Sequence, residues 1–407
     1  MKWEIAKLGD ISKNIQTGPF GSQLHQSDYS ECGIPVVMPK DLVGGKISEE
    51  SIARVDKTHV ERLCRHKIEV GDILYSRRGD VGRCAHVTKK EEGWLCGTGC
   101  LRVTIDSEKA DSRFVFFQLQ HPDTVGWVEK HAVGATMLNL NTTILSSVPI
   151  RLPALEIQKR IADILSAYDD LIENNQKQIK LLEEAAQRVY KEWFVNLRFP
   201  GHENTKIVDG VPEGWRVASI ADICDTVGGG TPSTKIQSYY EKGDILWVTP
   251  TDITRNFSLA LLDTEKKITP EGLKNSSAKM LPAETILMTS RASVGFFGMC
   301  KYEVCTNQGF ISCIPKRENL QMYLLFNLKS RVEEIRQKAG GSTYLEISKT
   351  VFRELKIILP KDEVLAEYQK NVHDIFDEIY CRTEMIKSLV DMRNRLLPKL
   401  MSGEVEV

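Results

Sequence analysis

The stretch YSRRGDVG, residues 75–82, places two arginines in a glycine-bounded turn directly after the apolar segment Asp72–Leu74. Arginines on a glycine turn are typical of phosphate binding, because guanidinium groups pair with phosphate oxygens and glycine lets the main chain approach closely. The phosphate could belong to a nucleotide cofactor, to a substrate or to a nucleic-acid backbone. The rest of the sequence has to distinguish these possibilities.

The signatures of nucleotide binding and of common catalytic sites are missing. The sequence has no phosphate loop of the form G-x4-G-K-[ST], and the glycines at 97–99 and 228–230 lack the rest of a dinucleotide fingerprint. It also lacks an Asn-Pro-Pro-aromatic tetrapeptide, a G-x-S-x-G elbow and an H-E-x-x-H pair. No nuclease-type aspartate with an acidic-x-Lys triplet lies on a convincing strand-turn-strand. We therefore predict no catalytic residues in this chain.

The ten cysteines and eight histidines do not have the spacing of a metal site. Cys96 and Cys100 are separated by three residues and Cys300 and Cys305 by four, and no C-x2-C pair or suitably spaced histidine pair accompanies them. We predict no bound metal and interpret the cysteines as reduced, mostly buried small apolar residues.

The composition is that of a soluble globular protein, with 42% hydrophobic and 27% charged residues in 407. No run of eighteen apolar residues and no secretory signal is present, which leads us to expect a cytoplasmic protein. The net charge of -1 gives no whole-chain signature for nucleic acid, although a local basic cleft is compatible with it.

The second half of the sequence repeats the first at an offset near 210 residues, in matched blocks of the same order. The shared features are aromatic, apolar, glycine and Leu-Pro positions, so we interpret the chain as two diverged copies of one unit. The matched blocks are Trp3, Leu8, Asp10 and Ile11 with Trp215, Ile220, Asp222 and Ile223; 17–23 with 228–234; 36–42 with 246–253; 72–82 with 285–295; 134–141 with 341–348; and Leu152-Pro153 with Leu359-Pro360.

Each copy begins β-rich and ends in a long helix of heptad spacing. We call the residues expected to face the partner helix the seam. In the first helix the seam is Ile157, Ile161, Ile164, Tyr168, Leu171, Ile179, Leu182, Ala186, Val189 and Trp193, with polar Asn175 and one extra residue near it. In the second helix it is Leu365, Tyr368, Val372, Ile375, Ile379, Ile386, Leu389, Leu396 and Leu400. Helices of roughly 55–60 Å are too long to lie across one small domain. We expect them to pair antiparallel, with a β-rich globule at each end, although two separate core helices remain an alternative.

Two similar modules on a helical spacer suit the reading of two separated sites on a duplex. Polar loop residues near the repeated blocks are the candidates for DNA contact, although any exposed loop carries such residues. In the first copy they are Ser22, Gln23, His25, Lys40, Asp41, Arg77, Arg78, Asp80 and Thr98; in the second they are Thr234, Lys235, Thr251, Arg291, Asn307 and Gln308. Arg77 and Asp80 differ between the copies and are the better candidates for base choice.

The tandem arrangement, TGPFGSQ, SRRGDVG and the helix start LPALEIQKRIADIL together resemble the specificity (S) subunit of type I restriction-modification systems. The resemblance covers essentially the whole chain. It implies an α+β fold with two target recognition domains and two long helices forming an antiparallel coiled coil, related by a pseudo-two-fold internal repeat. The implied boundaries are 1–152 and 201–359 for the recognition domains, and 153–200 and 360–407 for the helical spacers.

The resemblance also implies a division of labour. Each recognition domain would read one half of a bipartite, asymmetric DNA site, and the helices would set the gap and dock two methyltransferase (M) subunits carrying S-adenosylmethionine. Restriction (R) subunits would join for cleavage that uses ATP and Mg, and this chain itself would hold no cofactor. The second helix start, LPKDEVLAEYQ, departs from the pattern.

Four helix residues are candidates for the contact with the partner, with solvated helix faces as the alternative: Gln158, Arg160, Tyr190 and Phe194. Two other functions remain open at this point. One is a diverged, self-contained DNA methyltransferase or nuclease, and the other is a coiled-coil scaffold that binds only protein.

Overall fold

Strands are short in both halves of the chain, because glycine, proline and turn residues interrupt the apolar runs after two to six residues. The computed structural model describes residues 3–134, 138–341 and 344–407. The chain forms two compact units: unit 1 consists of Met1–Asp170 with Leu389–Val407, and unit 2 of Leu171–Ser388. Residues 135–137 and 342–343, within the repeated blocks 134–141 and 341–348, lie outside the described residues.

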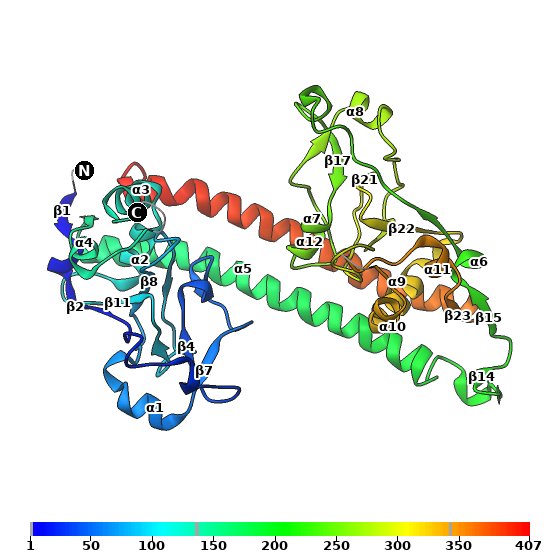
Figure 1. Cartoon of the computed structure of the whole chain (residues 1–407), viewed down its shortest axis with the longest axis horizontal. Coiled ribbons are helices and arrows are strands. Elements are labelled where there is room, and N and C mark those ends of the chain that lie inside the picture. Colours follow the sequence, from blue (N-terminus) through cyan, green and yellow to red (C-terminus); the bar gives the residue numbers. More distant parts are fainter. Residues whose placement is uncertain (1–2, 135–137, 342–343) are drawn as a thin grey trace. The chain divides into compact units, whose positions relative to one another are not determined.

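The central sheet of unit 1 is antiparallel and has the strand order β2-β11-β8-β9 (Figure 1). A second sheet has the order β10-β4-β7-β3, with β10 parallel to β4, and two pairs, β1-β12 and β5-β6, complete the unit. The strands are β1 (Glu4–Lys7), β2 (Ser12–Thr17), β3 (Tyr29–Ser30), β4 (Ile34–Val37), β5 (Leu42–Val43), β6 (Lys46–Ile47), β7 (Ala53–Val55), β8 (Ile73–Ser76), β9 (Cys84–His86), β10 (Leu95–Cys96), β11 (Cys100–Ile105) and β12 (Pro149–Leu152).

Unit 2 repeats the topology of the central sheet and has a smaller second sheet. Its central sheet has the order β16-β22-β19-β20, its second sheet is β18-β17-β21 with β17 parallel to β21, and β15 pairs with β23 as β1 pairs with β12. The strands, including the β13-β14 hairpin, are β13 (Ile207–Val208), β14 (Val211–Pro212), β15 (Arg216–Ser219), β16 (Cys224–Val227), β17 (Ile245–Val248), β18 (Lys267–Ile268), β19 (Ile286–Thr289), β20 (Phe297–Gly298), β21 (Cys305–Thr306), β22 (Phe310–Pro315) and β23 (Lys356–Leu359).

Three helices follow the last strand of each central sheet, α2, α3 and α4 in unit 1 and α9, α10 and α11 in unit 2, and the other short helices precede it. Unit 1 contains α1 (Lys57–Arg62), α2 (Ser112–Gln120), α3 (Pro122–His131) and α4 (Thr142–Ser146); unit 2 contains α6 (Ile220–Ile223), α7 (Pro250–Thr254), α8 (Pro270–Lys274), α9 (Gln321–Ser330), α10 (Val332–Gln337) and α11 (Lys349–Arg353). Single 3-10 turns lie at Leu8–Ile11, Gln26–Asp28, Pro39–Asp41, Cys64–His66, His202–Asn204, Gln237–Tyr239 and Glu318–Leu320. The ten cysteines are all free, and seven of them are buried.

Two long helices end the two copies: α5 (Leu155–Tyr190), which continues in a wider turn over Lys191–Val195, and α12 (Asp362–Ser402). The last turns of α12 belong to the core of unit 1, where Leu400 and Met401 are packed with Phe114 and Ile161. In unit 2 the two helices run antiparallel, since Tyr190 lies against Tyr368 and Asn175 against Arg382 (Figure 1). Within the described part of the chain, every helix is too short or too polar to span a bilayer.

The buried positions of α5 correct the predicted seam. Ile172 is buried, whereas Leu171 is 48% exposed, so the expectation of Leu171 in the seam with an extra residue nearby is wrong. The series of buried and half-buried side chains alternates steps of four and three without interruption: Ile161, Leu165, Tyr168, Ile172, Asn175, Ile179, Leu182 and Ala186. In α12, Phe376 is buried, whereas the predicted Ile375 is only half-buried. Two adjacent apolar residues allow two phases, and only packing selects between them.

Asn175 is the polar member of this seam and is 4% exposed. Its Nδ2 donates to the carbonyl of Leu171 (2.8 Å), and its Oδ1 accepts a hydrogen bond from Nη1 of Arg382 on α12 (3.1 Å). The Nε of Arg382 is buried without a partner among the described residues, so Asn175 supplies one of few acceptors for that cation.

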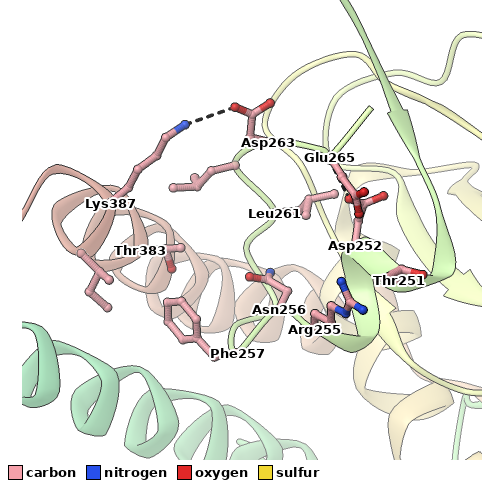
Figure 2. A pocket seen from close by; sticks show the side chains of 12 residues that line it. Thr251, Asp252, Arg255, Asn256, Phe257, Leu261, Asp263, Glu265, Thr383 and Lys387 are labelled. Atoms are coloured by element: carbon pink, nitrogen blue, oxygen red, sulfur yellow. Dashed lines mark hydrogen bonds and ion pairs between the residues drawn. The ribbon is translucent and has the colours of Figure 1, made fainter. Parts of the chain in front are cut away.

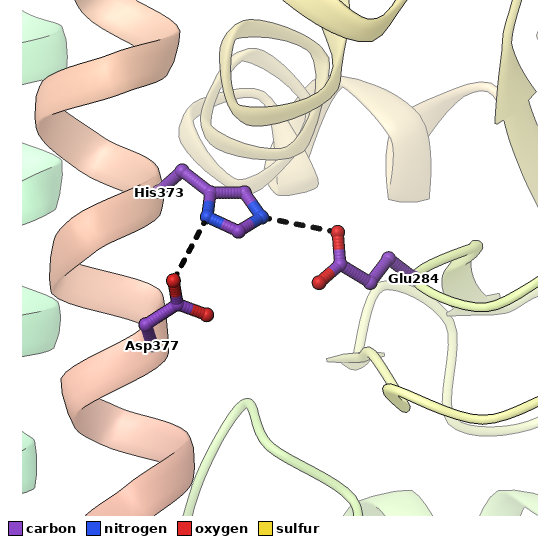
Figure 3. Close-up of side chains that lie close together, drawn as sticks. All are labelled: Glu284, His373 and Asp377. Carbon is purple, nitrogen blue, oxygen red and sulfur yellow. Dashed lines mark hydrogen bonds and ion pairs between the residues drawn. The ribbon is translucent and has the colours of Figure 1, made fainter.

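His373 on α12 lies between two carboxylates of unit 2 (Figure 3). Its Nε2 is 3.1 Å from Oε2 of Glu284, and its Nδ1 is 3.3 Å from Oδ2 of Asp377. The hydrogen bond to Glu284 raises the pKa of His373 above its ordinary 6.5, against the opposing effect of burial. The same bond lowers the pKa of Glu284 below its ordinary 4.5. Lys301 shares Asp377, with its Nζ 2.6 Å from Oδ1. A protonated His373 therefore attaches α12 to the loop before β19.

We expect Asn175→Ala to destabilise unit 2 by about 1–2 kcal/mol, because Arg382 loses an acceptor in a seam closed to water. The measurement is the urea midpoint at constant slope. Asn174→Ala is the matched control, since Asn174 is the exposed neighbour on the same helix turn. Equal midpoints for the two variants would contradict the assignment.

We expect the stability of unit 2 to fall as pH rises through the pKa of His373. A group whose pKa is raised on folding contributes fully below its unfolded value, about 6.5, and loses that contribution above its folded value. Glu284, whose pKa is lowered, contributes above about 4.5 and stays constant in this window. The urea midpoint should therefore decrease as pH rises above about 6.5, the ordinary pKa of histidine. This decrease should be smaller in His373→Gln, whereas His131→Gln, at an exposed position in unit 1, should behave like the unmodified chain.

Candidate nucleic-acid interface

Five loops meet at one edge of the central sheet of unit 1. Strands β2 and β8 both run antiparallel to β11, so their last residues lie beside the first residues of β11. Main-chain hydrogen bonds join the loops there: Arg77 N–H donates to the carbonyl of Gly99, and Leu140 N–H donates to the carbonyl of Arg77 (both 2.8 Å). We call these loops, residues 18–25, 38–41, 77–82, 97–99 and 138–141, edge 1.

Glycines allow the loops of edge 1 to approach one another closely. A Cβ atom on Gly18 would lie 2.0 Å from the carbonyl oxygen of Gly97, and one on Gly97 would lie 2.6 Å from that of Val37. No side chain fits at either position, which explains the glycines in TGPFG and in the GTG stretch before β11. The edge is thus a backbone frame whose shape depends on contact between main chains.

Unit 2 builds the same frame from the equivalent loops. Ser290 N–H donates to the carbonyl of Gly309 (2.8 Å), and Ile347 N–H donates to the carbonyl of Ser290 (3.0 Å). Asn307 N–H donates to Val248 as Gly97 N–H does to Val37 in unit 1 (3.0 and 2.9 Å). Residues 229–235, 249–252, 290–295, 306–309 and 344–347 form edge 2.

The structure brings the predicted residues of the first copy together on edge 1, in different environments. Ser22, His25, Arg78 and Asp80 are exposed, with Asp80 paired to Arg83. Lys40 is exposed, and its Nζ donates to Ser51 O (2.7 Å), while Arg77 is half-buried.

Three predicted residues of edge 1 use their side chains inside the fold. Asp41 is only 2% exposed, and its carboxylate accepts from Met38 N–H (2.8 Å). The Oε1 of Gln23 accepts from Phe20 N–H (3.1 Å). The hydroxyl of Thr98 donates to the carbonyl of Pro19 (2.9 Å). Asp41 therefore caps a turn, and Gln23 and Thr98 hold the loop around Phe20.

On edge 2 the predicted residues are mostly exposed: Thr234, Lys235, Thr251, Arg291 and Gln308. Asn307 is half-buried, and its Oδ1 accepts from Gly309 N–H (2.8 Å). Arg291 lies 3.7 Å from the carboxylate of Glu346, a residue that sequence reasoning missed. Phe20, which is 53% exposed on edge 1, was missed as well, although an aromatic side chain between Gly-Pro and Gly in a predicted loop was a usable signal.

The structure gives three of the four helix residues proposed for partner contact an internal role instead. Gln158 is 2% exposed; its Oε1 accepts from Asp111 N–H (3.0 Å), and its Nε2 donates to Pro153 O (2.9 Å). Tyr190 is buried and accepts a hydrogen bond from Asn327, and Phe194 packs against aromatic rings of unit 2. Only Arg160 has an exposed side chain.

The contact made by Gln158 also explains the irregular start of the second long helix. In unit 2 the Oε1 of Gln369 accepts from Met322 N–H at the start of α9 (2.9 Å), as Gln158 does at the start of α2. Gln158 follows Pro153 by five residues and Gln369 follows Pro360 by nine. The difference of four is about one helical turn, so the glutamine keeps its direction.

A pocket of about 350 Å³ lies in unit 2 between α7, the segment that follows it, and α12 (Figure 2). Three of its charged side chains are engaged: Lys387 Nζ is 3.4 Å from Asp263, and Asp252 accepts from the main chain of Thr249 and Glu265. We do not assign this pocket a cofactor.

Among the described residues, Glu284, His373 and Asp377 form the group whose ligand atoms are close enough for one metal ion, within 4.8 Å of one another. The imidazole directs a different nitrogen to each carboxylate (Figure 3), and one ion cannot bind both nitrogens of one ring. The geometry is that of an imidazolium bridging two carboxylates.

Known proteins resemble this chain over its full length. It is 24% identical to the specificity subunit of the type I restriction enzyme HindI of Haemophilus influenzae, over 99% of each chain, and 24% identical to the putative MjaX specificity subunit of Methanocaldococcus jannaschii, over 100% of this chain and 94% of that one. The crystal structure of a type I restriction-modification S subunit from M. genitalium has a TM-score of 0.63 at 17% identity, covering 98% of this chain and 96% of that one. This last similarity shows the fold.

A family profile described as "Type I restriction modification DNA specificity domain" matches residues 1–184 and 212–390. The two matches together cover most of the chain, and each contains one of the two loop edges. The chain therefore belongs to the family of type I restriction-modification DNA specificity domains.

Proposed function

We propose that the chain reads a bipartite, asymmetric DNA site, with one half-site bound at edge 1 and the other at edge 2. As a member of its family it is a DNA-specificity subunit and not itself an enzyme. One observation above all supports recognition of two half-sites. The two edges share the same pattern of main-chain hydrogen bonds and differ in the side chains that their loops carry. Arg77, Asp80 and Thr98 stand where unit 2 has Ser290, Ser293 and Gln308.

The shared and the variable residues of the frame have different tasks in this proposal. Arg78 and Arg291 occupy the same exposed position in both edges, which suits a contact to phosphate that fixes register without reading sequence. The side chains at the matched positions 77 and 290, 80 and 293, and 98 and 308 differ in length, charge and hydrogen-bonding groups. Residues that read different bases must differ in this way. Two unlike edges would produce two unlike half-sites.

We further propose that α5 and α12 form an antiparallel coiled coil that acts as the spacer, with recognition domains at 1–152 and 201–359 and helical segments at 153–200 and 360–407. The uninterrupted four-three spacing of α5 and the Asn175–Arg382 bond support this. A polar pair at one level of an apolar seam favours a single register, and a fixed register would fix the gap between half-sites.

The partners we propose are double-stranded DNA, two methyltransferase subunits carrying S-adenosylmethionine, and restriction subunits that use ATP and Mg. Relatives of this chain are named as subunits of restriction enzymes, which supports an assembly of this kind. With Gln158, Tyr190 and Phe194 occupied inside the fold, Arg160 is the remaining candidate of the four for the methyltransferase contact.

We expect Gln308→Ala to relax recognition at one base of one half-site and to leave the other half-site unchanged. Loss of a bidentate contact to adenine reduces discrimination by about 1–3 kcal/mol. The measurement is adenine-methylation sequencing of DNA modified by the complex assembled with methyltransferase subunits. Gln237→Ala is the control, because Gln237 is exposed in unit 2 outside edge 2. A change in both half-sites would contradict the assignment of one half-site to each edge.

We expect Arg291→Ala, in contrast, to weaken binding of all duplexes to a similar extent. Loss of one phosphate contact should reduce the slope of log affinity against log salt by about 1. Titration of the assembled complex with cognate and unrelated duplexes at several salt concentrations measures this. If affinity decreased for the cognate duplex alone, Arg291 would instead be a base reader.

Removing one heptad from each long helix tests the spacer. Deleting Leu171–Lys177 together with Ile379–Met385 removes both members of the Asn175–Arg382 pair and shortens each helix by about 10 Å. We expect the half-sites to stay the same and the gap between them to shrink by roughly three base pairs. Methylation sequencing measures both, and an unchanged gap in an active complex would exclude the spacer role.

A further inference from the structure

Phe20 is an exposed aromatic side chain on a rigid loop. It is 53% exposed, yet its main chain is bonded on both sides: its N–H donates to Oε1 of Gln23 (3.1 Å), and its carbonyl accepts from Gln23 N–H (2.8 Å). The preceding carbonyl, of Pro19, accepts from the hydroxyl of Thr98. These main-chain bonds fix the loop from which the phenyl ring projects at the edge.

Arg77 lies against the face of this ring. Its guanidinium carbon is 5.8 Å from the ring centroid of Phe20, within the range of a cation–π contact. Its main chain is held by Gly99 on one side and Leu140 on the other. Among the described residues, its buried Nε has no hydrogen-bond partner and its guanidinium forms no ion pair.

The arrangement is specific to edge 1. Unit 2 has Ser290, 3% exposed, at the position of Arg77, and the loop GGTPST in place of the loop that carries Phe20. The neighbouring Asp80 is engaged with Arg83 and leaves Arg77 unpaired. The Arg77 guanidinium is planar and is supported on one face by an aromatic ring. Because it has no internal partner among the described residues, its N–H groups stay free for an external acceptor.

We propose that Phe20 is a positioning residue that holds the Arg77 guanidinium for bidentate contact with one guanine of the half-site read by edge 1. The inference rests on the proposed function and specifies its chemistry. Guanine presents O6 and N7 in the major groove at the spacing of the arginine fork. Restricting the guanidinium before binding reduces the entropy lost on contact, so the ring strengthens discrimination without touching the base.

The test uses the full chain assembled with methyltransferase subunits and duplexes in which single guanines of the determined motif are replaced by 7-deazaguanine. This base lacks the N7 acceptor and keeps O6. For the unmodified chain, replacement at one guanine of the edge 1 half-site should weaken binding by about 5-fold, the lower end of the range for a bidentate contact, because the bond to O6 is kept. Arg77→Ala should abolish that sensitivity, and guanines of the other half-site serve as internal controls.

The Phe20 variants separate positioning from folding. Phe20→Leu should reduce the sensitivity to 7-deazaguanine at that position by about 2- to 5-fold, the strength of an exposed cation–π contact, and Phe20→Tyr should restore it. Arg77→Lys keeps the charge and loses the planar fork, so it should also lose the sensitivity even if Phe20→Leu failed to fold.

Three outcomes would overturn the inference while leaving the proposed function intact. The first is that the half-site read by edge 1 contains no guanine. The second is that Phe20→Leu keeps the full sensitivity to 7-deazaguanine. The third is that Phe20→Leu weakens binding of all duplexes equally while Arg77→Ala leaves the affinity unchanged. The last would mean that the ring contacts DNA itself. A recognition motif that stays the same when the whole of residues 1–152 is exchanged would instead overturn the proposed function.

Discussion

The main chain of residue 77, and of residue 290 in the second unit, is hydrogen-bonded on both sides to other loops, and both edges depend on this clamp. It joins the end of β8 or β19 to the start of β11 or β22 and to the loop before α4 or α11. Loops fixed in this way by main-chain atoms keep their shape when side chains change. The side chains at the clamp can therefore vary, as Arg77 and Ser290 do, without loss of the fold.

The long helices follow a related principle, in which polar groups fix what apolar packing leaves open. Apolar side chains fill the seam of α5, but a regular apolar seam tolerates a shift in register. Asn175 with Arg382, and His373 with Glu284 and Asp377, are polar contacts that only one alignment of α12 in unit 2 can make. The glutamines Gln158 and Gln369 bond the start of each long helix to the start of the helix after each central sheet.

The order of the repeated blocks and the period of apolar residues were sufficient to predict the two copies and the long helices. They were insufficient where one residue type can serve either the fold or the site. The matched blocks predicted two β-rich copies, and the 78/291 pairing is the one that the clamped loops adopt. Leu171 and Ile172 are adjacent and both apolar, so only packing decided the phase of the seam. Asp41 looks like a base reader in sequence, but its carboxylate caps a turn, and Gln158 looks like a surface residue of a long helix. Phe20 was missed because an exposed aromatic residue gives no periodic signal.

The turn after β8 shows that the frame itself is under constraint. Gly79 has φ of 76°, and its counterpart Ala292 has φ of 60°, in the left-handed region that costs a non-glycine residue about 1 kcal/mol or more. An unconstrained turn carrying alanine would relax to a negative φ. Ala292 keeps the strained conformation because its N–H donates to Leu345 O, as Gly79 N–H donates to Leu138 O. The conformation of this turn sets the direction of the exposed arginine before it, Arg78 in unit 1 and Arg291 in unit 2. The strained turn therefore keeps this arginine in the same place in both units, although the neighbouring residues differ.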